Sequence, residues 1–162
     1  IWVTGASRGI GLATAWAVAQ AGGRVALSAR KQESLVDAAL AINLEYPERA
    51  QAFPCHVGRA MEIDETLSRI EDEMGRPDVL INNAGINSVD SFDELEDETW
   101  QAILDVNLTG VMRVTRALLP ALQSSKGVIV NISSVSGIRG QVTQAAYAAS
   151  KGGGGRGDRE NK

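Results

Sequence analysis

The chain has 162 residues, of which 44% are hydrophobic and 22% are charged, and its formal net charge is -4. This length suits one domain with one core, and the near-average composition excludes disordered, collagen-like and coiled-coil proteins. An acidic chain without a basic patch argues against nucleic-acid binding, and no apolar run reaches the roughly 18 residues of a membrane span.

Short apolar runs alternate with longer amphipathic runs along the chain. Strands are predicted, in chain order, at Ile1–Thr4, Arg24–Ser28, Ala50–Cys55, Val79–Asn82 and Val128–Ile132. Helices are predicted between them at Gly9–Ala21, Glu33–Tyr46, Ala60–Met74 and Glu98–Leu122, and a last helix starts near Ala145. This alternation indicates βαβ units and a parallel sheet, and hence a doubly wound, Rossmann-like α/β domain. The apolar runs of the fourth and fifth strands predict strands covered on both faces.

Both ends of the chain suggest a partial sequence. The chain begins without Met, directly in a strand, and the eleven residues from Gly152 onward contain no apolar side chain. We therefore divide it into a partial nucleotide-binding domain, residues 1–151, and a flexible Gly/charged tail, residues 152–162. The four glycines from Gly152 each disfavour helix by about 1 kcal/mol relative to Ala, so they oppose its continuation past Lys151. The one cysteine, Cys55, cannot form an internal disulfide, which fits a reducing compartment and predicts a cytoplasmic protein.

A glycine-rich turn joins the first strand to the first helix. Its glycines allow a tight turn and close approach of a ligand, and the helix start offers N–H groups to a pyrophosphate. The spacing G-x-x-x-G-x-G differs from the G-x-G-x-x-G fingerprint, so a tight turn without a ligand is the alternative. We predict that the turn binds a cofactor through Gly5, Ser7, Arg8, Gly9, Ile10 and Gly11.

The residues after the second strand decide between the two nicotinamide cofactors. A carboxylate there would bind a ribose 2′-hydroxyl, whereas an arginine accommodates a 2′-phosphate. This chain has Arg30 and Lys31 at that point and no acid before Glu33, and Arg8 could supply a second guanidinium. NADP(H) is therefore predicted, with Arg30 as a phosphate ligand and NAD(H) as the less favoured cofactor. Solvated loop charges are the alternative.

A phenol and an ammonium stand four residues apart, at Tyr147 and Lys151, and so share one face of a helix. The ammonium would favour the phenolate, which suits Tyr147 to general acid–base work near neutral pH. Ser134 lies thirteen residues before the tyrosine, just past the fifth strand. Ligands of open α/β sheets bind at that carboxyl edge.

Together the motifs resemble the short-chain dehydrogenase/reductase family over residues 1–151, and most closely its 3-oxoacyl-carrier-protein reductases. The resemblance is carried by Thr4-Gly5-x-x-x-Gly9-x-Gly11, Asn82-Asn83-Ala84-Gly85, Asn107, Ser134 and Tyr147-x-x-x-Lys151. It implies an oxidoreductase that transfers a hydride between NADP(H) and a carbonyl or secondary alcohol, with a small-molecule substrate and no metal. Relatives commonly form dimers or tetramers, so a homo-oligomer is implied if the long helices are complete.

The resemblance also implies roles for single residues. Tyr147 would exchange a proton with the substrate oxygen, and Ser134 would hydrogen-bond that oxygen, with Ser133 as the rival serine. Lys151 would hold the nicotinamide ribose, and Asn107 would hold a water of a proton relay. The cofactor's adenosine side would be lined by Asn83, Ala84 and Gly85. His56 stands where relatives carry an aspartate that contacts adenine, which weakens that expected hydrogen bond.

Two other interpretations stay open. Family members usually continue well beyond the active-site lysine, so the chain could be a nucleotide-binding module without turnover. It could also fail to fold stably alone, because apolar faces meant for further strands would be exposed.

Overall fold

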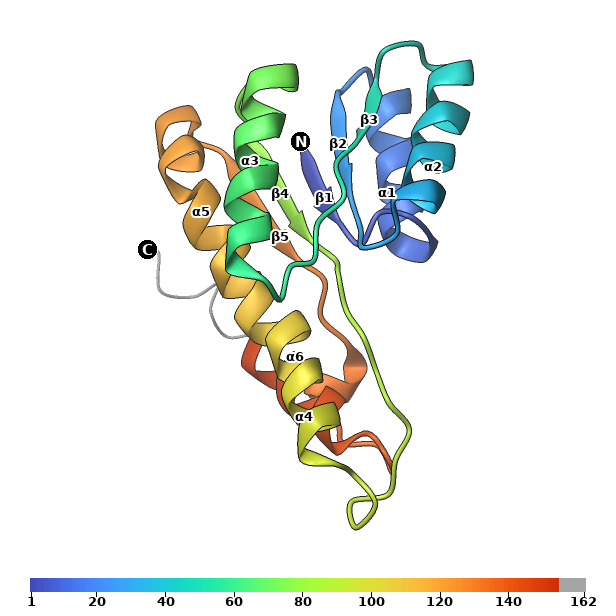
Figure 1. The fold of residues 1–162 in the computed structure, drawn as a ribbon, viewed down its shortest axis with the longest axis vertical. Coiled ribbons are helices and arrows are strands. Elements are labelled where there is room, and N and C mark those ends of the chain that lie inside the picture. The colour runs from blue at the N-terminus through green and yellow to red at the C-terminus, as the bar shows by residue number, and fades with distance from the viewer. Residues whose placement is uncertain (155–162) are drawn as a thin grey trace.

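The chain forms a five-stranded parallel sheet with helices on both faces (Figure 1), in a computed structural model that describes residues 1–154. The strands are β1 (Trp2–Thr4), β2 (Val25–Ser28), β3 (Ala50–Ala52), β4 (Val79–Asn82) and β5 (Val128–Asn131). Their order in the sheet is β3-β2-β1-β4-β5, and all neighbours pair in parallel. The chain therefore runs outward from β1 and then returns to β4, which leaves a switch point between these two strands. The predicted α/β class is confirmed.

The helices lie in two layers, with α1 and α2 on one face of the sheet and α3 and α5 on the other (Figure 1). They are α1 (Gly9–Gln20), α2 (Gln32–Glu45), α3 (Ala60–Met74), α4 (Asp97–Leu104), α5 (Gly110–Ser125) and α6 (Ala145–Gly154). A π-helical turn, η1 (Asp105–Thr109), interrupts the helix that was predicted as continuous over Glu98–Leu122, and a 3-10 turn, η2 (Val135–Gly137), precedes α6. In the part of the chain that the structure describes, no helix has the length and apolar character needed to cross a membrane.

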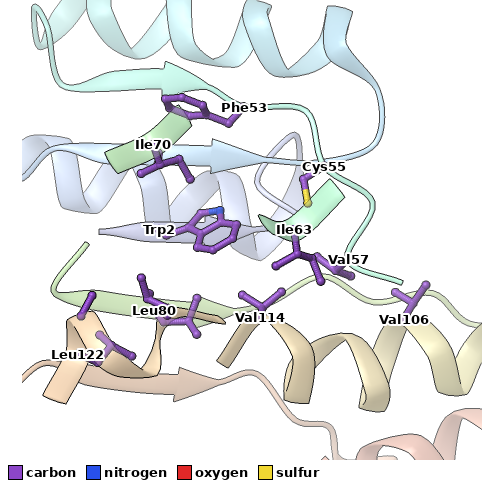
Figure 2. Close-up of a cluster of buried hydrophobic side chains, with 13 residues drawn as sticks. Trp2, Phe53, Cys55, Val57, Ile63, Ile70, Leu80, Val106, Val114 and Leu122 are labelled. Atoms are coloured by element: carbon purple, nitrogen blue, oxygen red, sulfur yellow. The ribbon is translucent and has the colours of Figure 1, made fainter. Parts of the chain in front are cut away.

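Neighbouring residues of β1 belong to two separate cores, because side chains along a strand point to alternate faces. The core beneath α3 and α5 includes Trp2, Phe53, Ile70, Leu80 and Leu122 (Figure 2). The core beneath α1 and α2 includes Val3, Ala15, Leu27, Leu35 and Ile42. Both layers of helices are thus fixed to the central strand of the sheet, which also carries the glycine turn at its carboxyl end.

A buried hydrogen bond links the neighbouring strands β1 and β2, and its loss should lower the free energy of unfolding measurably. The indole Nε1 of Trp2 donates to the hydroxyl of Ser28 at 2.8 Å, and both residues are buried. Ser28→Ala leaves that N–H without an acceptor, so we expect the free energy of unfolding to fall by about 1–3 kcal/mol in urea denaturation. In a Trp2→Phe background the same substitution should cost much less. An equal cost in both backgrounds would show that the hydrogen bond is not the cause.

The strand β5 is covered on one face only, so the prediction of two covered faces is wrong for it. Ile129 packs into the core beneath α3 and α5, but the side chains of Val128 and Val130 are 54% and 40% exposed. Val128 pairs with Val79 of β4, and Val130 pairs with Ile81. All four side chains lie on the sheet face that α1 and α2 cover over the other strands. The position of β5 at the end of the sheet explains the difference, since no described helix reaches this part of the face.

The helix α6 continues past the predicted boundary at residue 151 and reaches Gly154. The helix touches η2 backbone to backbone, which leaves little room for side chains where the two meet. A Cβ on Gly137 would lie 2.7 Å from the carbonyl carbon of Lys151, and one on Gly152 would lie 3.2 Å from the Gly137 oxygen. Tertiary packing thus outweighs the low helix propensity of glycine. The rest of the predicted tail, residues 155–162, lies outside the described residues.

Candidate active site

A cavity of about 710 Å³ opens at the carboxyl ends of the strands. It is lined by the glycine turn and by the loops that follow β2, β3 and β4. This is the edge where open α/β sheets bind ligands, and it adjoins the switch point between β1 and β4. Of the residues predicted to bind a cofactor, the cavity lining includes Gly5, Ser7, Arg8, Gly9, Ile10, Arg30, Asn83, Ala84 and Gly85.

The glycine turn is held so tightly that two of its glycines admit no side chain. A Cβ on Gly11 would lie 2.4 Å from both the Gly5 oxygen and Nδ2 of Asn83, and one on Gly5 would lie 2.8 Å from Cα of Ala84. Gly5 also has a φ of 66°, in the left-handed region that favours glycine. Gly11 is buried and thus supports the turn from beneath, while Gly9 faces the cavity.

Thr4 and Asn83 join the glycine turn to the loop after β4. The Thr4 hydroxyl accepts hydrogen bonds from the backbone N–H groups of Asn83 and Ala84, both at 3.1 Å. In return, Nδ2 of Asn83 donates to the carbonyl oxygens of Thr4 and Gly5, both at 3.0 Å. Asn83 therefore fixes the shape of the turn rather than only lining the cavity. The sequence did not predict this hydrogen-bonding role of the Thr4 hydroxyl, and the only sign of it was that Thr4 directly precedes Gly5.

Three cationic side chains line the cavity, and none has an acidic partner among residues 1–154. Arg8 directly precedes α1, while Arg30 and Lys31 follow β2, and all three are exposed. The described residues that line the cavity include no Asp or Glu. The same wall includes the amino-terminal end of α1, whose N–H groups and dipole favour an anion. This end of the cavity is therefore suited to phosphate groups.

The far end of the cavity is formed by Cys55, His56 and Val57, which follow β3. The thiol of Cys55 points toward the carbonyl oxygen of Glu62, 3.7 Å away. Burial raises the pKa of this thiol to about 11, so it stays protonated at neutral pH and is a poor nucleophile. His56 is half-buried, and its Nδ1 accepts a hydrogen bond from the Gly58 N–H at 3.1 Å.

Tyr147 and Lys151 lie together on α6, as the four-residue spacing predicted. The Lys151 Nζ lies 5.8 Å from the centroid of the Tyr147 ring, within the range of a cation–π contact. It also donates to the carbonyl oxygen of Ile132, just past β5, at 2.9 Å. Burial of the ammonium lowers the pKa of Lys151 below its ordinary value. The lysine is thus anchored between α6 and the end of β5.

Asn107 is buried in the π-helical turn η1 and ties three segments together. Its Oδ1 accepts from the Ile86 N–H and its Nδ2 donates to the Ile86 oxygen, both at 2.8 Å. Nδ2 also donates to the hydroxyl of Ser150 at 3.0 Å, and that hydroxyl donates to the backbone carbonyl oxygen of Tyr147 at 2.7 Å. Ser150 was not predicted as part of the site. Its place three residues after the tyrosine, on the same helical face, was the only signal.

The two candidate serines after β5 make different hydrogen bonds. Ser133 donates its hydroxyl hydrogen to the Lys151 carbonyl oxygen at 3.3 Å. The Ser134 hydroxyl instead accepts a hydrogen bond from the Ser136 N–H at 3.2 Å and begins the turn η2. A hydroxyl that accepts in this way keeps its own hydrogen for another acceptor. Ser134 is therefore better placed than Ser133 to donate to a substrate oxygen.

Gly85 connects the cavity with the catalytic candidates. It lines the cavity, and a Cβ built on it would lie 3.4 Å from Oδ1 of Asn107 and 3.6 Å from Nζ of Lys151. The Asn107 amide and the Lys151 ammonium therefore lie close to a residue that lines the cavity, although Tyr147, Lys151, Ser134 and Asn107 are not among its lining residues.

Comparison with known proteins agrees with this arrangement. A sequence profile of the family described as short chain dehydrogenase matches residues 1–156. The chain is 41% identical over 152 residues to a 3-oxoacyl-[acyl-carrier-protein] reductase of Synechocystis, covering 93% of this chain and 62% of that protein.

Solved structures give the same result. An alcohol dehydrogenase from Thermococcus sibiricus, complexed with 5-hydroxy-NADP, superposes with a TM-score of 0.90 at 30% identity and covers 94% of this chain and 65% of that one. An NADPH-bound short chain oxidoreductase from Pseudomonas aeruginosa superposes with a TM-score of 0.89 at 34% identity, covering 94% of this chain and 60% of that one. The chain therefore spans somewhat less than two thirds of these proteins. The family inferred from the motifs is confirmed, and the chain belongs to the short chain dehydrogenase family.

Proposed function

We propose that this chain carries the cofactor-binding and proton-transfer residues of an NADP(H)-dependent oxidoreductase that interconverts a carbonyl and a secondary alcohol. The observation that carries this proposal is the position of Gly85, which both lines the cationic cavity and approaches the Lys151 ammonium. A dinucleotide that lies along the cavity would then bring its reactive end toward Tyr147.

The residues that line the cavity fit a dinucleotide phosphate. Gly5 and Gly11 leave no room for side chains beneath the turn, so the backbone is held close to a ligand. Arg30 and Lys31 stand where a ribose 2′-phosphate is recognised, and neither is paired with an acid in the described part of the chain. The Synechocystis relative is named as a reductase, and two structural relatives hold NADP-type cofactors, which supports this choice.

The proposed mechanism assigns a separate task to each residue. When bound, NADPH supplies the hydride. Tyr147 donates a proton to the substrate carbonyl oxygen and accepts it in the reverse direction. Ser134 donates a hydrogen bond to the same oxygen, where negative charge develops. Lys151 places a positive charge beside the Tyr147 ring and would hold the nicotinamide ribose of a bound cofactor, while Asn107 holds α6 against the loop after β4.

Cofactor preference provides the test of this proposal. Arg30→Ala removes a charged donor from the predicted 2′-phosphate site, so the Kd for NADPH should rise about 10–100-fold while the Kd for NADH changes less than about twofold. Both constants can be measured by fluorescence titration. The matched control is Arg24→Ala, because Arg24 bonds the Met74 carbonyl oxygen and does not line this cavity. Equal weakening of both cofactors, or tighter binding of NADH by the unmodified chain, would contradict the proposed preference.

A further inference from the structure

The base end of the cavity presents a hydrogen-bond donor at His56. The Nδ1 of this ring accepts the Gly58 N–H at 3.1 Å, so the neutral ring carries its hydrogen on Nε2. The backbone is fixed as well, because the His56 N–H donates to Oε2 of Glu62 at 2.7 Å. That carboxylate is further occupied by Arg59, which binds its other oxygen at 2.7 Å. The ring is therefore held in one tautomer by its own loop.

The other side chains at this end offer no acceptor that competes with the donor. Nε2 of His56 has no hydrogen-bond partner within residues 1–154. The neighbouring Cys55 thiol is directed at the Glu62 carbonyl oxygen, and Ala29 and Val57 are apolar. Among the side chains of Ala29, Cys55, His56 and Val57, the Nε2–H group of His56 is therefore the donor that is free to bind a ligand.

The order of the strands shows which part of a dinucleotide would reach His56. The glycine turn follows β1, Arg30 follows β2 and His56 follows β3, and these three strands are neighbours in the sheet. A pyrophosphate at the turn and a ribose phosphate at Arg30 would therefore leave the purine base at His56. This step rests on the proposed function.

We propose that His56 recognises the purine base as a hydrogen-bond donor, through Nε2–H, and pairs with an acceptor atom of the base rather than with the adenine amino group. Adenine carries an amino donor beside ring-nitrogen acceptors, whereas a 6-oxo purine carries an acceptor in place of the amino group. N7 of the ring, next to the 6-position, accepts in both bases, so a donor that pairs with N7 tolerates either base. An aspartate, which can only accept, would pair with the amino group and would repel the O6 that takes its place.

Binding of two cofactors to two variants tests the assignment. The probes are NADPH and its reduced hypoxanthine analogue, in which the adenine amino group is replaced by oxygen, and the readout is Kd from fluorescence titration. The unmodified chain should bind the hypoxanthine analogue at least as tightly as NADPH. His56→Asp should prefer NADPH by about tenfold, while the matched control His56→Gln, which keeps a donor, should show no more than about a twofold preference.

The tautomer provides a second test that needs no cofactor. Because His56 is the only histidine in the chain, its ring nitrogens can be assigned directly in a long-range nitrogen–proton NMR spectrum at about pH 8. Hydrogen on Nε2 is expected, and hydrogen on Nδ1 would overturn the proposal. A tenfold preference of the unmodified chain for NADPH, or an unchanged preference in His56→Asp, would also overturn it. If the unmodified chain binds neither cofactor, the proposed function itself fails, and the assignment of the base falls with it.

Discussion

Tyr147→Phe is expected to lower carbonyl-dependent oxidation of NADPH by about 10²–10⁴-fold, the usual contribution of a positioned general acid. The substitution removes one oxygen and leaves the ring that lies 5.8 Å from the Lys151 ammonium. Cofactor affinity should therefore change less than about threefold. The measurement pairs the decrease of NADPH absorbance, with a 3-oxoacyl thioester as substrate, with a fluorescence titration of NADPH.

A matched control for this substitution is Tyr46→Phe. Tyr46 follows α2 and packs against the core beneath α1 and α2, and within residues 1–154 its exposed hydroxyl bonds only to Glu45. Turnover should be unchanged in this variant. If Tyr147→Phe keeps full turnover, the proton does not come from the phenol, and the assignment of Tyr147 is wrong.

Gly11→Ala is expected to abolish tight cofactor binding and to destabilise the domain. Its Cβ would lie 2.4 Å from the Gly5 oxygen, which belongs to the turn itself, so the turn must open to make room. Overpacking of this kind costs about 1–3 kcal/mol of unfolding free energy. The displaced turn should also raise the Kd for NADPH at least tenfold. Urea denaturation and fluorescence titration measure the two effects.

The matched control is Gly22→Ala, because Gly22 has a φ of 82° and open space around its Cβ position. The left-handed backbone should cost about 1–2 kcal/mol of stability, as it does for most residues with a side chain. Since Gly22 does not line the cavity, cofactor affinity should be unaffected. If Gly11→Ala also binds NADPH as tightly as the unmodified chain, the glycine turn does not bind the pyrophosphate.

The fold was largely predictable because local signals agree with the tertiary arrangement. Apolar runs predicted the five strands, and the glycine turn falls at the junction of β1 and α1. The third strand is shorter than predicted and ends at Ala52, although the N–H groups of Phe53 and Cys55 still donate to the carbonyl oxygens of Leu27 and Ala29. The exposed face of β5 was not predictable, since an apolar strand sequence does not reveal which helices cover it.

The candidate site was predictable as a set of residue types but not as a set of hydrogen bonds. The spacing of Tyr147 and Lys151 predicted their shared face, because helical periodicity is local. The π-helical turn at Asn107 adds one residue to a turn, which the amphipathic pattern of the helix does not reveal. The different hydrogen bonds of Ser133 and Ser134 likewise depend on how α6 and η2 pack together.

The central claim is that a hydride passes from the cofactor to a carbonyl carbon in this site. The most direct test incubates the chain with a 3-oxoacyl thioester and NADPH that carries deuterium at the transferred position of the nicotinamide, and then analyses the product by mass spectrometry. The account predicts an alcohol with one deuterium on the former carbonyl carbon, and no such product from Tyr147→Phe. Saturable NADPH binding without deuterium in any alcohol, across a panel of thioester and ketone substrates, would contradict the account and identify the chain as a nucleotide-binding module.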